Sequence, residues 1–292
     1  MIFNMVGAAV GGVKYLPQFD SYWNLVLSKD GKSGYAEFFG SSTLTWRDNL
    51  IPPMIDVTCV GGGGGGESYY RYNEDIYHAG SGGAGGVVTT VLSAIIDAVT
   101  SITVGAGGKG GTNGGNGANG GTSSFGTLCV APGGTGGSKD SNNNNKTIAG
   151  SGGNAGGLGG VKQNTLRYAG THGSSNGTSP PASGNNSQIA GTSQGTPTVD
   201  ILGRTHAGGG AGGAISSGTQ YYGGSSTYPK RSGQNGASEY SAGNYRYGGT
   251  GGGGGAGGGG GGGAGFYSGN GGDGGDGLVV IGWGDYTSLI GA

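Results

Sequence analysis

The sequence predicts a mainly β protein, an antiparallel β-sandwich with an inserted bundle of polyglycine-II helices and long irregular loops. The first observation behind this prediction is glycine, which supplies 81 of 292 residues and recurs every third residue in stretches such as 105–121, GAGGKGGTNGGNGANGG. The second is that segments with strand character flank these stretches. The third is a hydrophobic content of 32 %, which leaves little for a conventional core, so backbone hydrogen bonds must supply much of the cohesion.

A period of three residues matches neither the 3.6-residue turn of an α-helix nor the two-residue repeat of a strand. It matches the left-handed extended helix, which has three residues per turn and no internal hydrogen bonds. The amides and carbonyls of such a helix point outward, and glycine lets neighbouring helices approach closely enough to pair them. Disorder is the alternative, because glycine is costly to order. The regular phase and the flanking strands favour an ordered bundle.

The charge balance excludes some classes of protein. The formal net charge is −1 and only 10 % of the residues are charged, so the basic surface of a nucleic-acid-binding protein is missing. Residues 1–13 lack the basic segment that begins a signal peptide. The most apolar window, 87–104, is interrupted by Asp97 and by several Ser and Thr residues, which makes it too polar to span a bilayer. We expect no nucleic-acid partner and no membrane insertion.

The first fifty residues suggest an N-terminal attachment region with short strands, followed by a glycine-rich domain over 51–292. Residues 22–28 and 35–39 are expected to form a hairpin around the turn KDGKSG. Residues 41–46 alternate as in a strand. Residues 54–60 are expected to form a half-buried strand that runs directly into the glycines 61–66.

Further strands are predicted along the rest of the chain. Residues 87–92 and 101–106 are expected to be strands, with 93–99 as a short helical crossing between them. Residues 122–132 resemble a strand pair with a kink at Gly126, and 277–283, GLVVIGW, form a strong closing strand. The order of strands, a long glycine insertion and one last strand favours a sandwich whose loops carry the bundle.

Two cysteines, Cys59 and Cys129, each end a strand that enters glycine, and they could be neighbours in one sheet. Two buried thiols are the favoured interpretation. A disulfide would need an oxidising compartment, and whether the two pair stays open.

The loops between the glycine stretches carry the candidate binding residues. The expected recognition loops are 67–79, 138–149, 161–207 and 214–247. They are rich in Tyr, Ser, Asn and Thr, the composition of antibody binding loops, in which Tyr supplies large contact area at low entropy cost. The alternative is that the tyrosines cap the ends of the bundle. The candidate ligand-binding residues are Tyr69, Tyr70, Tyr72, Tyr221, Tyr222, Tyr228, Arg231, Tyr240, Tyr245, Arg246 and Tyr247.

Other motifs carry little chemistry. GGDGGDGLV at 271–279 fits one calcium-binding nonapeptide, which makes Asp273 and Asp276 a weak calcium candidate. The alternative is a glycine helix with both aspartates on its solvent face. His78, His172 and His206 are each isolated in polar loops and are expected to be surface residues. No catalytic arrangement or phosphate-binding loop stands out, so we expect a non-enzymatic protein without a cofactor.

The succession VTCVGGGGGG (57–66), ITVGAGGKGG (102–111), NGGTSSFGTLCVAPGG (119–134) and GGDGLVVIGW (274–283) resembles the glycine-rich domain of phage and prophage tail proteins. The opening MIFNMVG is similar to the N-termini of prophage tail proteins. The resemblance covers roughly 41–134 and 248–283; residues 161–247 match no pattern of the family. It implies the polyglycine-II sandwich of tail-fibre adhesins, in which loops between the helices form the tip that meets the host receptor.

The sequence and the resemblance together predict a receptor-binding protein of a tail-fibre tip. Its expected partners are a host cell-surface glycan or protein and, through the N-terminal region, other tail proteins. A homotrimer and a location in the virion tail, after assembly in the host cytoplasm, are also expected. The alternative is a purely structural fibre or baseplate component whose loops make oligomer contacts. An ice-binding protein and a polysaccharide depolymerase are weaker alternatives.

Overall fold

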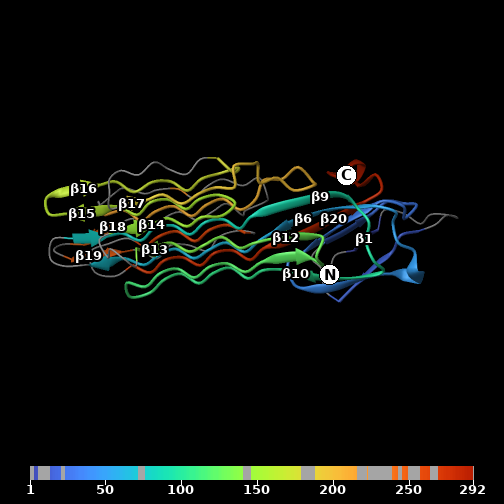
Figure 1. The fold of residues 1–292 in the computed structure, drawn as a ribbon, viewed down its shortest axis with the longest axis horizontal. Coiled ribbons are helices and arrows are strands. Elements are labelled where there is room, and N and C mark those ends of the chain that lie inside the picture. The colour runs from blue at the N-terminus through green and yellow to red at the C-terminus, as the bar shows by residue number, and fades with distance from the viewer. Residues whose placement is uncertain are drawn as a thin grey trace.

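The fold is elongated, with a β-sandwich at one end and a bundle of extended glycine segments, here called rods, at the other (Figure 1). It is seen in a computed structural model that describes residues 3–5, 14–20, 24–71, 76–140, 146–178, 188–215, 222, 239–242, 245–248, 257–263 and 269–291. The chain is mainly β, and its helical residues in the described part form two short 3-10 turns, η1 (Arg47–Asn49) and η2 (Tyr286–Leu289). None of the described helices is long and apolar enough to cross a membrane.

The sandwich consists of two sheets whose strands are almost all antiparallel. The six-stranded sheet has the order β1 (Phe3–Met5), β3 (Asn24–Leu27), β4 (Gly34–Phe38), β20 (Leu278–Trp283), β6 (Ile55–Val60) and β9 (Val88–Ala94). The five-stranded sheet has the order β12 (Cys129–Ala131), β11 (Ser123–Phe125), β10 (Val99–Thr103), β5 (Ser42–Trp46) and β2 (Pro17–Phe19). β1 runs parallel to β3, and it is the one parallel pairing among these described strands.

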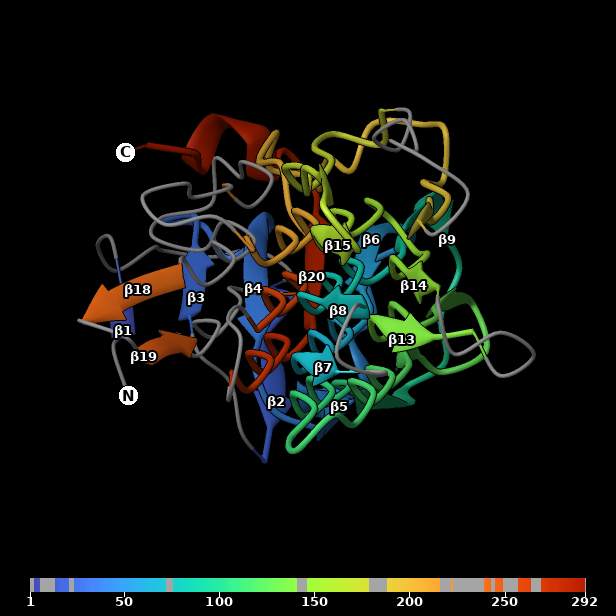
Figure 2. The same ribbon diagram turned by 90° about the vertical axis from the view of Figure 1, so that its left-hand side faces the viewer.

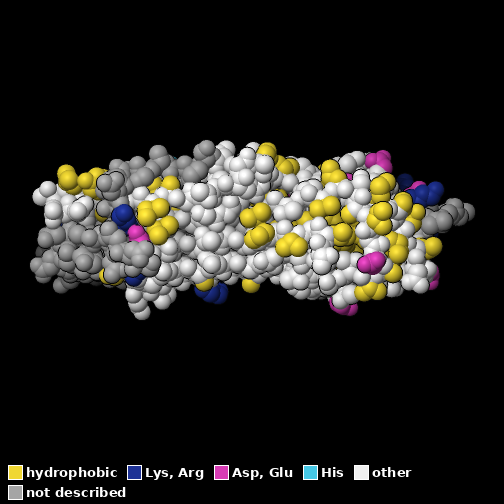
Figure 3. All heavy atoms as spheres, in the orientation of Figure 1, with side chains coloured by type: hydrophobic (Ala, Val, Ile, Leu, Met, Phe, Trp, Pro, Cys, Tyr) yellow, Lys and Arg dark blue, Asp and Glu magenta, His cyan; other side chains and the backbone are white. Residues whose placement is uncertain are grey.

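The apolar core lies between the two sheets. Phe38, Leu44, Ile55, Phe125 and Trp283 are among its fully buried side chains. The rings of Trp46 and Trp283 meet edge to face, with centroids 5.3 Å apart. Hydrophobic side chains are dense over the sandwich half of the face shown in Figure 3 and sparse over the bundle. Different interactions therefore stabilise the sandwich and the bundle.

Most of the predicted strands form. The hairpin of β3 and β4, the strand β6 that enters glycine and the closing strand β20 are confirmed, and Gly126 adopts a positive φ of 51° between β11 and β12. The helical crossing at 93–99 is wrong. Ser93 and Ala94 extend β9, β10 begins at Val99, and the few residues between them turn from one sheet to the other, too few for a helix.

The region expected to attach to other tail proteins is built into the sandwich. β2, β3, β4 and β5 lie in the same two sheets as β6, β10 and β20. The boundary at residue 50 therefore does not fall between two sheets, and the attachment role of residues 1–50 stays a prediction.

The two cysteines are free and buried. Cys59 lies in β6 and Cys129 in β12, so they come from opposite sheets and are not neighbours in one sheet as the sequence suggested. The Cys59 thiol donates a hydrogen bond to the carbonyl of Cys129 (3.4 Å), which places the pair across the core.

The rods show the predicted three-residue period in their hydrogen bonds. In rod 61–69, every third amide donates to the same neighbour, at 2.8–3.1 Å. Gly61, Gly64 and Glu67 donate to carbonyls of rod 79–87. The next residue of each triplet donates to 115–121 and the third to 269–275. No strand or helix could distribute its bonds in three directions, so these segments are polyglycine-II helices.

Rod 61–69 also accepts hydrogen bonds from three further segments, 105–111, 133–137 and 257–263. The three segments whose carbonyls accept hydrogen bonds from its amides run antiparallel to it. The three segments whose amides donate to its carbonyls run parallel to it. Six neighbours thus surround this rod, so its backbone groups are satisfied without any side chain.

Close packing makes glycine obligatory inside the bundle. A methyl group built at Gly63 would lie 2.0 Å from the carbonyl oxygen of Gly258, and one at Gly64 would lie 2.2 Å from that of Thr135. Both distances are far inside van der Waals contact, and the obstacles are backbone atoms that cannot step aside.

A buried polar cluster fastens the bundle to the sandwich. Arg204 contacts Glu37 of β4 at 2.5 Å and Asp200 at 2.7 Å, and the Nε2 atom of His206 lies 2.7 Å from the same Asp200 carboxylate. Burial alone would raise the pKa of Asp200, but hydrogen bonds and charge from His206 and Arg204 hold that pKa below its usual range. His206 is fully buried, so the prediction of a surface histidine is wrong there.

Candidate functional site

Short strands gather at the end of the bundle that lies farthest from the sandwich, here called the distal tip (Figures 1 and 2). One small sheet has the order β16 (Leu166–Tyr168), β15 (Val161–Gln163), β8 (Ile76–His78) and β7 (Tyr70–Arg71). A second contains β13 (Ser138–Lys139), β14 (Thr147–Ile148) and β17 (Gln188–Ile189), and a hairpin joins β18 (Glu239–Ala242) to β19 (Tyr245–Gly248). These strands form where the glycine ends, so parts of all four expected recognition loops, 67–79, 138–149, 161–207 and 214–247, contribute to the tip. The end of the third loop does not: Ile201 and Arg204 contact β6 and β4 of the sandwich.

Glu67 forms the base of the tip and is fully buried. It follows Gly61 and Gly64 in the three-residue phase, so it occupies a rod position. Its Oε2 atom accepts the amide of Ser81 (3.1 Å) and the hydroxyl of Thr147 (2.7 Å). Ser81 belongs to rod 79–87, in which the amides of Ala84 and Val87 donate to backbone carbonyls of 132–135. The amide of Ser81 donates to the Glu67 carboxylate instead. Glu67 therefore completes the bonding where one rod leaves the bundle.

Burial shifts the titration of two groups in the tip. It raises the pKa of Glu67 to about 7, an effect partly offset by hydrogen bonds from Thr147 and Ser81 and by the charge of Lys139. Burial, with a smaller contribution from Lys139, lowers the pKa of His78 to about 4. His78 is 1 % exposed, so the surface position expected for it is wrong, whereas His172 is exposed as expected.

Two of the candidate tyrosines pack against the bundle. Tyr69 is 8 % exposed, and its amide donates to Gly269 (2.8 Å). The ring of Tyr70 contacts the Lys139 ammonium, 4.0 Å from its centroid, and stacks on the His78 ring, with the centroids 6.5 Å apart. These contacts are those expected of residues that cap the ends of the rods.

A second lysine lies over a tyrosine in the small sheet. The ammonium of Lys162 on β15 is 4.9 Å from the ring centroid of Tyr77, its cross-strand partner on β8. On the other side, Lys162 is directly opposite Arg167 of β16. Two like charges opposite each other weaken a strand pair, whereas the contact with the Tyr77 ring favours the position of Lys162.

Tyr222 is the most exposed of the candidate tyrosines whose side chain is described, at 56 %. Its ring stacks on His172 with the two planes 4° apart and the centroids separated by 5.6 Å. Its amide donates to His172 Nδ1 (2.8 Å). This pair presents a flat, rigid aromatic face.

The other candidates are described in part or not at all. Tyr240, Tyr245, Arg246 and Tyr247 lie in the hairpin of β18 and β19, of which only the backbone is described. Tyr72, Tyr221, Tyr228 and Arg231 lie outside the described residues. Their role as ligand-binding residues stays a prediction.

Comparison with known protein families assigns the chain to one of them. A family described as a glycine-rich domain matches residues 40–284. The chain belongs to this family. A search of curated proteins found no match. The matched range covers both the rods and most of the sandwich, so the glycine-rich domain comprises the two together. β20, which lies between β4 and β6 in the six-stranded sheet, is inside the match.

In this glycine-rich domain, the two aspartates of the calcium-like motif cap backbone amides. Asp276 Oδ1 accepts the amide of Gly107 and Asp273 Oδ1 that of Gly110, each at 2.8 Å. The other oxygen of Asp273 accepts the Lys109 ammonium (2.7 Å), and this ion pair is the main reason that its pKa is lowered. Both aspartates are exposed on a rod, as in the alternative interpretation. No cluster of three or more His, Cys, Asp or Glu residues that could hold a metal is found within the described chain.

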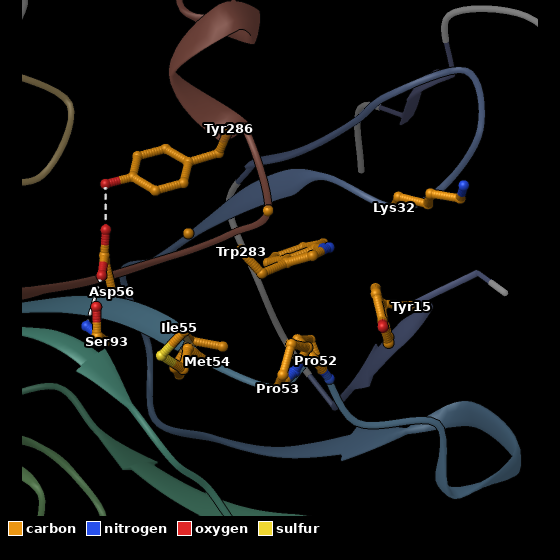
Figure 4. A pocket seen from close by; sticks show the side chains of 12 residues that line it. Tyr15, Lys32, Pro52, Pro53, Met54, Ile55, Asp56, Ser93, Trp283 and Tyr286 are labelled. Atoms are coloured by element: carbon orange, nitrogen blue, oxygen red, sulfur yellow. Dashed lines mark hydrogen bonds between the residues drawn. The ribbon is translucent and has the colours of Figure 1, made fainter.

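A pocket of about 310 Å³ lies at the opposite end of the molecule, beyond the last residues of β20 (Figure 4). Pro52, Pro53 and Met54 form one wall, Trp283 lies at its centre, and Tyr15 and Lys32 lie across from Tyr286. The Asp56 carboxylate accepts hydrogen bonds from the Tyr286 hydroxyl and the Ser93 amide, both at 2.8 Å, which fixes this side of the pocket.

Sequence reasoning missed Glu67, His78, Lys139 and Lys162 as parts of the tip. The phase of glycine was the available signal for Glu67, because it stands three residues after Gly64. The lysines carry no such signal. Their positions over Tyr70 and Tyr77 depend on how distant rods end side by side.

Proposed function

We propose that this chain is a tail-fibre or tail-tip protein of a phage or prophage that recognises a host cell-surface glycan or protein. The observation that carries the proposal is the placement of its short strands and loops. Short strands from four separate loops lie at one end of a stiff bundle, and the sandwich lies at the other end (Figures 1 and 2). A rigid support lowers the entropy that loops lose when a ligand binds.

The opposite end suits attachment. The sandwich contains the N-terminal strands β1 to β5, and it carries the pocket lined by Tyr15, Pro53 and Trp283. In the proposal, this end joins another tail protein, and the bundle holds the distal tip away from that junction.

The test is binding of the full chain to a panel of bacterial strains. The first variant replaces loop 214–247 by a Gly-Ser linker of equal length. The matched control is Asp48→Asn, an exposed change in the sandwich. We expect binding to fall at least tenfold for the loop variant and to stay unchanged for the control. Undiminished binding of the loop variant would remove this loop from the site, and binding to no strain would refute the adhesin proposal.

A structural component without a ligand is the second candidate. The packing of Tyr69 and Tyr70 against the rods favours it, because these tyrosines cap the bundle. Under this candidate, the tip makes oligomer contacts. Light scattering on the isolated chain separates the two: a stable oligomer that dissociates on Tyr222→Ala, with no binding to cells, would support the structural component.

A further inference from the structure

We propose that Cys59 and Cys129 are the site of an oxidative modification, in which a peroxide converts the two thiols into a disulfide bond between the two sheets of the sandwich. This inference goes beyond the proposed function and does not depend on it, because both cysteines lie in the sandwich and not in the distal tip.

The two cysteines lie along the side of the sandwich where its sheets converge. β12 is the outermost strand of the five-stranded sheet, and β6 and β9 are the last two strands of the six-stranded sheet. Cα atoms of β12 come within 8 Å of Cα atoms of β6 and of β9. Stacked sheets usually lie about 10 Å apart. The convergence therefore brings β6 and β12 towards the Cα separation of about 4.4–6.8 Å that a disulfide needs.

Hydrogen bonds place each thiol beside the backbone of the opposite sheet. Cys59 Sγ donates to the carbonyl of Cys129 (3.4 Å), and Cys129 Sγ donates to the carbonyl of Thr89 (3.2 Å). Thr89 is the cross-strand partner of Cys59, so both contacts lie at the same level of the sandwich. A hydrogen bond between the two thiols raises the pKa of Cys59 and lowers the pKa of Cys129. The chain has two cysteines, so each is the partner available to the other within one molecule.

Cys129 is the thiol that reacts first. Its strand lies at the edge of a sheet, and its neighbours Leu128 and Val130 are 43 % and 46 % exposed. Cys59 lies in β6, which is paired on both sides. Both cysteines are buried, so an oxidant enters through local opening of the edge strand β12. The lowered pKa also favours the nucleophilic thiolate at Cys129.

Hydrogen peroxide is an oxidant of suitable size for this site. The Cys129 thiolate attacks one peroxide oxygen and the O–O bond breaks, which leaves a sulfenic acid on Cys129 and a hydroxide that takes up the proton released by the thiol. The Cys59 sulfur then attacks the Cys129 sulfur. The S–S bond forms, and the sulfenic hydroxyl leaves as water with the Cys59 proton. Two thiols are thereby oxidised to one disulfide, and one peroxide is reduced to two waters.

The disulfide would join the bases of two neighbouring rods. Cys59 precedes rod 61–69 and Cys129 precedes segment 133–137, and these two segments are hydrogen-bonded to each other. The cysteines are 70 positions apart in the sequence, so a bond between them closes a long loop and restricts the unfolded chain. We expect the melting temperature of the oxidised chain to rise by on the order of 5–10 °C.

The experiment treats the full, folded and fully reduced chain with hydrogen peroxide. Intact-mass spectrometry, peptide mapping without reductant and thermal melting follow the reaction. The variants are Cys59→Ala and Cys129→Ala, and the matched control is the double variant. We expect the wild type to lose two hydrogen atoms, to yield a linked peptide containing Cys59 and Cys129, and to melt at a higher temperature until a dithiol reductant is added. None of the variants should gain stability from peroxide.

The order of reaction has its own test. Dimedone, which labels sulfenic acids, should label Cys129 in the Cys59→Ala variant at least tenfold faster than Cys59 in the Cys129→Ala variant. Equal labelling would overturn the assignment of Cys129 as the first thiol.

Three results would overturn the disulfide itself. They are a folded chain that keeps both thiols under conditions in which the urea-unfolded chain forms the bond, linkage between molecules only, and an oxidised chain that melts no higher than the reduced one. Binding of the reduced chain to bacterial strains is measured separately, so each of these results leaves the adhesin proposal standing.

Discussion

At the residue scale, the stability of the bundle depends on glycine having no Cβ atom. Gly64 has no side chain because its Cα faces the carbonyl of Thr135, where a methyl group would lie 2.2 Å from oxygen. The same holds along the central rods, so glycine here serves contact rather than flexibility.

The substitution Gly64→Ala tests this. We expect it to destabilise the fold by more than about 3 kcal/mol, because backbone on all sides cannot move to make room. Gly195→Ala is the control. It has no atom within 4 Å, so its cost comes only from its φ of 77° and is about 1 kcal/mol. Chemical denaturation measures both, and equal losses would contradict close packing at Gly64.

Glu67 gives the bundle a dependence on pH. Its carboxyl has a pKa of about 7 in the fold against 4.5 for an unperturbed glutamate, so the folded chain holds the proton more tightly. The contribution of Glu67 to the free energy of unfolding is fully present below about pH 4.5. It falls by on the order of 3 kcal/mol as the pH rises to 7.

Glu67→Gln should remove this slope, because glutamine still accepts hydrogen bonds from Ser81 and Thr147 but cannot become charged. Unfolding free energies measured from pH 4 to pH 8 provide the test. Asp48→Asn, at an exposed position, should retain the wild-type slope. A Glu67→Gln variant with that same slope would show that another group is responsible.

At the element scale, the rods illustrate what the sequence could and could not predict. The spacing of Gly105, Gly108, Gly111 and the glycines after them predicts a three-residue helix, because this period matches neither an α-helix nor a strand. The strands β6 and β20 were also predictable, since their residues favour extended structure. The order in which rods become neighbours was not, because every glycine stretch offers the same surface to every other.

The same reasoning explains the candidate site. Tyrosine-rich loops were identifiable by composition, but composition does not distinguish exposed Tyr222 from buried Tyr69. That difference depends on the rod that Tyr69 packs against and on His172 next to Tyr222, which come from distant parts of the sequence. The burial of His206 likewise depends on its contact with Asp200 and on Arg204, which joins Asp200 to Glu37 of β4.

The outer rods should be protected against pairing with other chains. Asp273 and Asp276 occupy the outward amides of Gly110 and Gly107, much as charged side chains protect the edge of a sheet. Asp273→Ala with Asp276→Ala should free these amides and cause concentration-dependent association. Asp273→Asn with Asp276→Asn retains the accepting oxygens and should behave as the wild type. Light scattering compares the variants, and an unchanged mass for the alanine variant would contradict this protective role.

At the scale of the whole molecule, two kinds of cohesion share one chain. The sandwich buries apolar side chains, whereas the bundle buries mainly peptide groups. Exposure of apolar surface raises the heat capacity on unfolding, and exposure of polar surface lowers it.

An ordinary domain of 292 residues would show a heat-capacity increase of about 3.5–4.4 kcal/mol/K. We expect a value below about 3 kcal/mol/K here, because the rods expose peptide groups and few hydrocarbon groups. Scanning calorimetry measures it directly. A value within the ordinary range would mean that the bundle buries more apolar surface than its composition allows.

The threefold alternation of bonding partners has a consequence for how such chains diverge. Inserting or deleting one residue within a rod turns everything after it by one third of a revolution, so each later amide faces the wrong companion. Only changes in multiples of three leave the frame intact. The connections between rods are not subject to this constraint. They can lengthen, shorten and diversify while the rods retain their hydrogen-bond register.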